Sequence, residues 1–387
     1  MQEKMIQIFQ STFGSEENIR LFFAPGRVNL IGEHTDYNGG HVLPCSLTIG
    51  TYAAVKRRTD RKIRFFSENF PELGVTEVTL DQMEFDEEHD WVNYPKGIIS
   101  VFSEEGKSVD TGFDIVYYGN IPNGAGLSSS ASIELVTCVV LNSLFDFGVT
   151  MEEMVRISQK TENQYIGVKC GVMDQFAIGM GKRDHAILLN TSTMVYKYAE
   201  LKLEDCVLII SNTNKRRGLA DSKYNERHEE CQGALRALQK VTEIFSLCDL
   251  SGESFEEHKH SIQNTVYRKR AKHVIYENQR TLQAFDYLNQ GKLDAFGKLM
   301  NESHTSLKED YEVTGLELDT LVKLAQNTQG VVGSRMTGAG FGGCTVSIVK
   351  KAYVDHFVKT IKPAYTNEIG YEPDFYIVEV GNGAGEI

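Results

Sequence analysis

A run rich in glycine and serine closes a short apolar segment and opens a long helical one in the first third of the chain. The run covers residues 119–132 and reads Gly-Asn-Ile-Pro-Asn-Gly-Ala-Gly-Leu-Ser-Ser-Ser-Ala-Ser. Apolar residues within 112–118 predict a strand before it, and apolar residues at helical spacing within 133–144 predict a helix after it. The chain must therefore pass from strand to helix through a glycine loop.

The start of such a helix attracts anions. Its first backbone N–H groups have no partner inside the helix, and the aligned peptide dipoles leave a charge of about +0.5 there. Gly124 and Gly126 let the backbone approach a phosphate closely, and Ser128, Ser129 and Ser130 add hydroxyl groups, one of which can be a ligand for Mg²⁺. Taken alone, the run indicates either a phosphate cradle or an ordinary helix cap.

The run matches neither of two common nucleotide loops. It lacks the lysine of G-x-x-x-x-G-K-[ST], and Ser129 stands where the third glycine of G-x-G-x-x-G would be. Other clusters of polar residues must therefore decide between a phosphate site and a cap.

A second cluster precedes the run and holds Arg27, Glu33, His34 and Asp36 within ten residues. Closely spaced hydrogen-bond acceptors suit the neighbouring hydroxyl groups of a sugar, because a buried site without partners is costly. A solvated turn is the alternative. A zinc site is disfavoured, because the next histidine, His41, follows seven residues after His34.

A third cluster contains two carboxylates, Glu162 and Asp174. One of them can hold Mg²⁺ while the other meets a hydroxyl group, although Glu162 alone also fits an exposed helix face. Asp174 lies in Val-Met-Asp-Gln-Phe, where apolar neighbours would remove an unpaired carboxylate from water at a high cost. Asp174 therefore needs a partner, and Arg27 is the candidate.

A fourth cluster is the glycine-rich stretch 333–344, which lies between Val331-Val332 and the apolar run 345–349. The pattern predicts strand, loop and strand. The glycines serve either tight turns alone or the close approach of a second backbone to the phosphates or to the catalytic loop.

Together the four clusters resemble the galactokinase, homoserine, mevalonate and phosphomevalonate kinase (GHMP) superfamily. Within it, residues 26–37 resemble the galactokinase family signature nearly throughout. The serine run resembles the ATP loop of the superfamily, Asp174 its acidic catalytic residue, and 333–343 its third motif. The resemblance extends from near residue 20 to the C-terminus.

The resemblance implies transfer of the γ-phosphate of MgATP to the C1 hydroxyl of galactose, giving galactose 1-phosphate, the first committed step of galactose catabolism. Asp174 would accept the C1 proton or act as an electrostatic anchor, and Arg27 would stabilise its ionised form and the charge on the phosphoryl oxygens. Two alternatives remain: a kinase for N-acetylgalactosamine or another hexose, and a catalytically inactive sensor of galactose and ATP. The complete serine run disfavours the sensor.

The resemblance also implies site residues by position. Galactose would contact Glu33, His34, Asp36, Gly171, Asp174 and Tyr224. ATP would contact Trp91, Tyr94, Gly124, Gly126, Leu127, Ser128, Ser129, Ser130, Ser132 and Arg216. Mg²⁺ would bind Ser130 and Glu162.

Trp91, the one tryptophan of the chain, has two interpretations. The segment 91–97 is similar to the galactokinase segment that stacks on adenine, and an aromatic ring suits a purine face. The alternative is a partly buried packing residue at the start of a helix.

Composition excludes several classes of partner. The chain has 387 residues, and 40 basic against 53 acidic residues give a net charge of −13. This charge argues against nucleic acid and anionic membranes as partners, and no obligate protein partner is evident. We find no secretory or membrane-spanning pattern and expect a cytoplasmic protein. The seven cysteines are odd in number and form no Cys-x-x-Cys pair, which predicts free, mostly buried thiols.

The length predicts two or three domains, and the order of strands and helices predicts two α+β units. We place the boundary near residue 203, which divides the chain into 1–203, with the sugar signature and the serine loop, and 204–387, with the third glycine motif. The resemblance implies the two-domain GHMP kinase fold. Its first domain is α/β with a left-handed β-α-β unit, its second is ferredoxin-like, and the active site lies between them.

Overall fold

The structure is a computed structural model that describes residues 1–14, 17–122, 126–215 and 220–387. The longer strands are β1 (Arg20–Asn29), β3 (Pro44–Arg57), β4 (Lys62–Ser67), β5 (Thr76–Thr79), β6 (Phe113–Gly119), β7 (His185–Asn190), β8 (Tyr196–Glu200), β9 (Cys206–Asn212), β10 (Val331–Thr337), β11 (Cys344–Lys350) and β12 (Asp374–Val378). Two short strands are β2 (His41–Val42) and β13 (Gly385–Glu386).

The helices of the first half are α1 (Gln2–Phe13), α2 (Asn93–Glu104), α3 (Ser129–Leu144), α4 (Met151–Lys160) and α5 (Met173–Gly179). Those of the second half are α6 (Ala220–Leu238), α7 (Gly252–His258), α8 (Thr265–Asn289), α9 (Leu293–Ser306), α10 (Gly315–Gln326) and α11 (Val354–Ile369).

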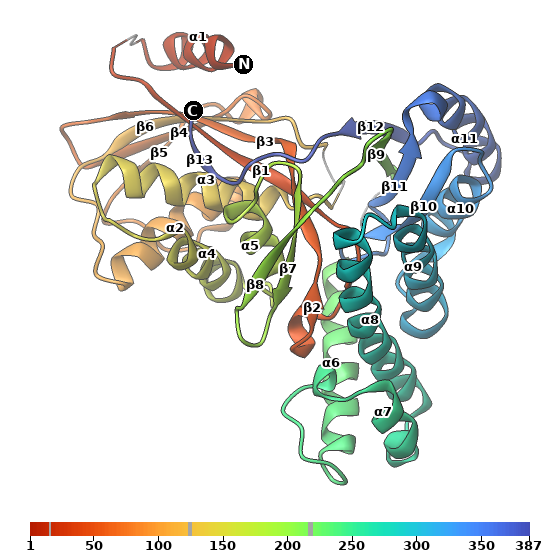
Figure 1. Cartoon of the computed structure of the whole chain (residues 1–387). Coiled ribbons are helices and arrows are strands. Elements are labelled where there is room, and N and C mark those ends of the chain that lie inside the picture. Colours follow the sequence, from red (N-terminus) through yellow and green to blue (C-terminus); the bar gives the residue numbers. More distant parts are fainter. Residues whose placement is uncertain (15–16, 123–125, 216–219) are drawn as a thin grey trace.

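The first half is built on a six-stranded sheet with the order β13-β1-β3-β6-β4-β5. All neighbours are antiparallel except β4 and β6, which run parallel and are connected through β5 and α2. Helices α2 to α5 lie on one face of this sheet and α1 lies on the other (Figure 1). The apolar side chains between sheet and helices form the larger core, in which α3 packs against β1 and β3.

The second half is built on a four-stranded antiparallel sheet with the order β10-β11-β9-β12. Numbered along the chain, these strands stand in the order 2-3-1-4, with helices between the first and second and between the third and fourth. This is the βαββαβ topology of a ferredoxin-like fold, as the resemblance implied. Helices α9 and α10 pack on β10, and α11 packs on α10.

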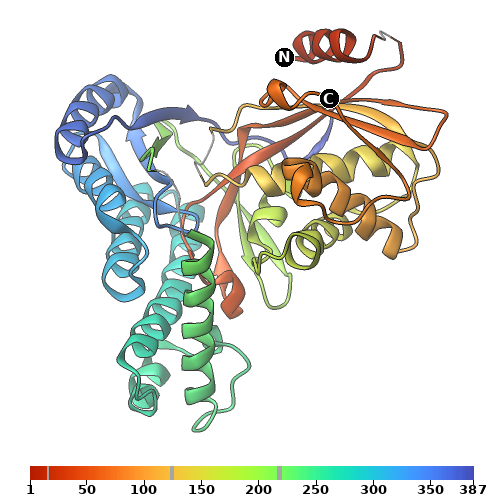
Figure 2. The same cartoon turned by 180° about the vertical axis from the view of Figure 1, so that it is seen from behind.

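Helices α6, α7 and α8 form an arm that projects from the second sheet, as both views show (Figures 1 and 2). Helix α8 is the longest, with 25 residues, and its first turn is capped by Asn264, whose side chain accepts from Val266 N and Tyr267 N. One side of α8 contacts β2 and β8 of the small sheet β2-β7-β8. The arm therefore meets the first half of the chain beside the segment that follows β1.

The expected elements are confirmed with small shifts of their ends. The strand and helix around the glycine and serine run are β6 and α3, and the apolar run at 345–349 lies in β11. The short strand β13 was not expected. It pairs with β1, so the last residues of the chain return to the first sheet, whereas the division at residue 203 assigned them to the second unit.

All seven cysteines are free thiols, as expected, and five of them are buried. Among the described residues, the helices all fall short of the length or the apolar composition needed to cross a bilayer.

Candidate active site

Arg27 and Asp174 form the ion pair that the sequence predicted. Arg27 lies near the end of β1, and its Nε and Nη2 donate to Oδ1 and Oδ2 of Asp174, each at 2.8 Å. Its third nitrogen, Nη1, donates to the carbonyl oxygen of Gly126 at 2.8 Å. The Arg27 side chain is 5% exposed and Asp174, in the first turn of α5, is 30% exposed, so the carboxylate borders an open space.

The serine run meets the same carboxylate. Ser128 precedes α3 and has φ of 61°, a left-handed conformation that is uncommon outside glycine. Its hydroxyl donates to Asp174 Oδ2 instead of capping α3. The first backbone N–H groups of α3 therefore receive no hydrogen bond from the Ser128 side chain. An anion can accept hydrogen bonds from them.

A cavity of about 200 Å³ opens beside Asp174. We call it the acidic cavity, because four carboxylates line it. Its lining includes Arg27, Glu33, His34, Asp36, Glu162, Cys170, Gly171, Met173, Asp174, Tyr224, Asn225 and Gly338. All six residues that the resemblance assigned to galactose are among them.

Glu33 is held from both sides. Asn29 Nδ2 donates to its Oε2 at 2.8 Å, and the backbone N–H of Gly338 donates to its Oε1 at 2.7 Å. Arg335 Nη1 lies 3.3 Å from the same Oε1. The glycine-rich stretch therefore contacts the loop that carries Glu33 through the backbone of Gly338.

Asp36 lies against Gly171. A Cβ atom added to Gly171 would collide with the Asp36 carboxylate, so any other residue there requires the Asp36 side chain to move. Burial, reinforced by the charges of Asp174 and Glu33, raises the pKa of Asp36 to about 7. Asp36 is therefore a weak acid that can change charge near neutral pH.

His34 is surrounded by aromatic rings. Its Nδ1 lies 2.8 Å from Tyr37 OH, and its ring centroid is 4.6 Å from that of Tyr311 and 5.8 Å from that of Tyr224. Burial lowers the pKa of His34 well below its usual range, so the imidazole is neutral. A neutral imidazole has one donor and one acceptor nitrogen, so it can form hydrogen bonds with hydroxyl groups and adds no charge to the cavity.

Glu162 lies in a π-helical turn, Thr161–Ile166, that continues α4. Ser130 Oγ donates to its Oε1 at 3.1 Å, and Gln175 Nε2 donates to its Oε2 at 2.7 Å. Burial, followed by the charge of Asp174, raises the pKa of Glu162 to about 7. In the part of the chain that the structure describes, no lysine or arginine forms an ion pair with this carboxylate.

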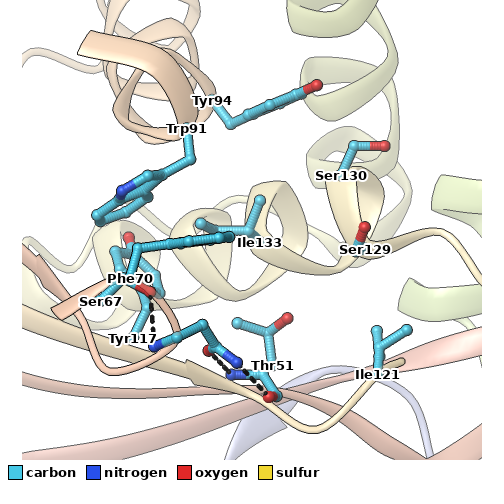
Figure 3. A pocket seen from close by; sticks show the side chains of 12 residues that line it. Thr51, Ser67, Phe70, Trp91, Tyr94, Tyr117, Ile121, Ser129, Ser130 and Ile133 are labelled. Carbon is cyan, nitrogen blue, oxygen red and sulfur yellow. Dashed lines mark hydrogen bonds between the residues drawn. The ribbon is translucent and has the colours of Figure 1, made fainter. Parts of the chain in front are cut away.

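A second cavity, of about 220 Å³, lies on the other side of the start of α3. We call it the aromatic cavity. In Figure 3, Trp91 and Phe70 stand at one end and Ser129 and Ser130 at the other. Its lining is completed by Thr51, Ser67, Asn69, Tyr94, Tyr117, Gly119, Ile121 and Ile133.

The two cavities share a wall. Ser130 lines the aromatic cavity, Glu162 lines the acidic cavity, and the hydrogen bond between them joins the two. Ser128 and Asp174 make a second connection. The helix start therefore stands between a flat apolar space and a space rich in carboxylates.

Two of the predicted ATP contacts are not supported. Ser132 is fully buried, its Oγ donates to Ala24 O at 2.8 Å, and it lines neither cavity. Leu127 is buried, and its carbonyl accepts from Arg27 N at 3.2 Å. Both residues anchor the start of α3 to the sheet, because the side of α3 that bears Ser132 faces β1 and β3. Gly124 and Arg216 lie outside the described residues.

Several residues that shape the site were not predicted. Phe70 was missed because it follows a strand in an ordinary loop, and Gln175 because its sequence position marks it only as a neighbour of Asp174. Arg335 lies within the fourth cluster, for which the prediction rested on the glycines alone. A buried arginine between glycines was a usable signal, because such a charge requires a partner.

Three family profiles match consecutive parts of the chain. The galactokinase galactose-binding signature matches residues 7–57, the GHMP kinases N terminal domain matches 93–182, and the GHMP kinases C terminal matches 284–363. These segments carry Glu33, the serine run and the third glycine motif, respectively.

Similar proteins match over the full length. The galactokinase of Clostridium acetobutylicum is 58% identical over 100% of this chain and 98% of its own. The galactokinase of Bacillus subtilis is 54% identical over 100% and 99%. The crystal structure of Lactococcus lactis galactokinase complexed with galactose is 47% identical, covers 100% of both chains and superposes with a TM-score of 0.98.

The fold and the two matching domains are those of a GHMP kinase. Within that superfamily, the chain belongs to the galactokinase family. Its activity is that of an ATP-dependent galactokinase.

Proposed function

We propose that the protein transfers the γ-phosphate of ATP to the C1 hydroxyl of galactose, with the nucleotide base in the aromatic cavity and the sugar in the acidic cavity. The shared wall between the two cavities carries this proposal, because a phosphoryl group must pass between donor and acceptor at one point. Ser128, Ser130, Glu162 and Asp174 meet at that wall.

The aromatic cavity suits adenine. Trp91 packs edge-to-face on Tyr117 with ring centroids 5.7 Å apart, and Phe70 lines the same space. A purine stacks well on such faces. From a base in this cavity, the triphosphate would extend toward Ser129 and Ser130, where the amides at the start of α3 provide donors.

The acidic cavity suits a hexose. Glu33, Asp36 and the neutral His34 offer acceptors and donors for several hydroxyl groups, and Tyr224 provides a flat apolar surface. Galactose is the sugar in complex with the Lactococcus lactis galactokinase, which this chain resembles over its whole length. The absence of a side chain at Gly171 would give one edge of the sugar close access to Asp36.

Asp174 would receive the C1 proton or orient the C1 hydroxyl electrostatically. Arg27 holds both oxygens of Asp174, so the carboxylate has one fixed orientation toward the cavity. The same guanidinium lies beside the Gly126 carbonyl and close to the helix start, where it would stabilise charge that develops on the phosphoryl oxygens. Orientation of this kind contributes several kcal/mol to catalysis.

Ser130 and Glu162 have the chemistry for Mg²⁺. Both offer oxygen atoms, and burial raises the pKa of Glu162, which a nearby cation would reverse. In the described residues no cluster of three or more His, Cys, Asp or Glu side chains forms a complete site, so phosphate oxygens would supply further ligands. Mg²⁺ bound there would neutralise negative charge on the phosphates.

The test is galactose-dependent release of ADP from ATP by the purified protein, with ³¹P detection of the sugar 1-phosphate. The same assay with N-acetylgalactosamine, glucose and arabinose defines the acceptor. A product phosphorylated elsewhere than C1, or a better acceptor than galactose, would contradict the proposal. The division of the chain into 1–203 and 204–387 also remains a proposal. The acidic cavity takes lining residues from both parts, whereas the aromatic cavity takes them from the first part alone.

A further inference from the structure

We propose that Glu277, on α8, is a positioning residue that holds the galactose-binding loop in its working shape. This inference rests on the proposed function, because it assigns a role to the loop that carries Glu33, His34 and Asp36. It gives the helical arm a part in sugar affinity although no residue of α8 lines either cavity.

Glu277 ties the loop to two helices. The backbone N–H of Gly32 donates to its Oε1 at 3.0 Å, and the Ser303 hydroxyl of α9 donates to the same oxygen at 2.5 Å. Arg280 Nε donates to the other oxygen, Oε2, at 2.8 Å. Gly32 immediately precedes Glu33, so the carboxylate acts at the residue before the first sugar-binding side chain.

Two other residues on the same face of α8 repeat the contact. His273 Nε2 lies 3.1 Å from the Glu33 carbonyl oxygen, and Asn278 Oδ1 accepts from His41 N at 2.8 Å. Positions 273, 277 and 278 lie on one side of a helix, because four residues make slightly more than one turn. The loop is therefore held at its beginning and at its end by one rigid element.

Glu277 and His273 each keep one protonation state near pH 7, so their hydrogen bonds to the loop do not depend on titration in this range. Burial alone would raise the pKa of Glu277. Nearby positive charge, that of Arg280 above all, lowers this pKa to about 2. Burial lowers the pKa of His273 to about 4, so its ring is neutral near pH 7. Because a carbonyl oxygen only accepts, Nε2 of His273 carries the hydrogen and Nδ1 accepts from the Ser306 hydroxyl at 2.9 Å.

The loop has little freedom to find another conformation by itself. Gly32 has φ of 97°, and a Cβ atom there would lie 2.7 Å from the His41 carbonyl oxygen and 2.9 Å from Thr281 Oγ1. His34 also has a positive φ, of 62°. Glycine adopts a positive φ readily, but at His34 this conformation persists only where the surroundings enforce it, and Glu277 supplies a charged, fully buried acceptor to Gly32, two residues before.

The aromatic cavity is built from residues 51–133 and touches none of these groups. Loosening the loop therefore weakens galactose binding and leaves nucleotide binding intact. A general loss of packing in the arm would also reach the acidic cavity, through Tyr224 and Asn225 of α6, so a control variant within the arm is needed.

The experiment compares Glu277→Gln and Glu277→Ala with the full-length wild type. We expect KM for galactose to rise about 10-fold for Gln, which keeps one acceptor oxygen, and more for Ala. We expect KM for ATP to stay within about twofold in both. Amide hydrogen exchange of residues 30–40, without ligand, should speed up in the same order.

Ile275→Ala is the matched control. Ile275 is fully buried in the core of the arm, about 160° around α8 from both His273 and Glu277, so its truncation weakens packing of the arm without removing a hydrogen bond to the loop. We expect a lower melting temperature without a change in KM for galactose. Ser303→Ala is a milder variant that removes one donor to Glu277 and should raise that KM by less than Glu277→Gln does.

The inference fails if the Glu277 variants raise both KM values equally, or if exchange in 30–40 is unchanged while stability falls. If ATP consumption by the wild type does not depend on galactose, the proposed function is overturned instead. In that case the hydrogen-exchange result still tests the attachment of the loop, so the two failures are distinguishable.

Discussion

Arg27 and Asp174 are joined by two parallel hydrogen bonds of 2.8 Å, although 147 positions separate them in the chain. Arg27 comes from β1 and Asp174 from α5, and the start of α3 lies between these elements with Ser128 bonded to the same carboxylate. A paired guanidinium and carboxylate of this geometry fix each other's orientation. These two side chains therefore hold one orientation without a bound substrate.

We predict that Asp174→Asn lowers kcat by about 10³-fold or more, because the amide neither accepts the C1 proton nor carries the charge that Arg27 faces. ADP release measured at saturating galactose and ATP checks this. Asp110→Asn is the control, because Asp110 pairs with Arg57 at an exposed position. Activity above a tenth of the wild type in Asp174→Asn would show that this carboxylate is not central.

We predict that Glu162→Gln raises the Mg²⁺ concentration needed for half-maximal activity at least 10-fold, because the amide removes the charge that attracts the cation. A Mg²⁺ titration at fixed ATP measures it. Glu253→Gln, at an exposed position of α7, should behave like the wild type. An unchanged Mg²⁺ requirement would remove Glu162 from the metal site.

We predict that Asp36 makes the ligand-free protein less stable as pH rises. Its pKa of about 7 in the folded protein lies above its value of about 4 in an unfolded chain, so the folded state binds more protons between these values. Stability is then highest below pH 4 for this group and falls by up to about 1.4 kcal/mol per pH unit until pH 7.

Asp36→Asn removes this dependence, so the stability of the variant relative to the wild type should increase from pH 5 to pH 7 and level off above it. Denaturant unfolding at each pH measures the difference. The comparison must be made at each pH, because buried His34 and His273 have lowered pKa values and act in the opposite direction below about pH 6.5. A difference independent of pH would contradict the prediction.

We predict that Trp91→Ala raises KM for ATP about 10-fold or more, because stacking of a base on an aromatic ring contributes about 1–3 kcal/mol. KM for galactose should stay within about twofold. In the wild type, ATP should change the fluorescence of Trp91, the one tryptophan. Phe245→Ala, at a position 95% exposed in the arm, is the aromatic control. Unchanged fluorescence and KM would leave Trp91 as a packing residue.

We predict that Gly171→Ala lowers galactose affinity about 10-fold or more, because the added Cβ would displace the Asp36 carboxylate. Isothermal titration with galactose measures the affinity directly. Gly385→Ala serves as the control, since a Cβ there meets no atom within 4 Å. Wild-type affinity in Gly171→Ala would show that Asp36 moves freely.

Local patterns predicted the elements around the site well. The strand before the serine run, the helix after it and the strand at 345–349 appear where the apolar patterns placed them, because these preferences act within a few residues. The pairing of Arg27 with Asp174 was also predictable, because a carboxylate among apolar residues needs a cation. The return of β13 to β1 carries no such signal, since it depends on a pairing across more than 350 positions.

The sequence by itself determined which chemical groups the site contains: an anion-binding helix start, an arginine and aspartate pair, and a loop of acceptors suited to a sugar. The tertiary structure decided which of these groups face the substrate cavities. It turned Ser132 toward the sheet and Ser130 toward Glu162, and it placed Glu277 behind Gly32. The reason is physical: a side chain's chemistry is local, whereas its partner is chosen by packing between elements that lie far apart in the chain.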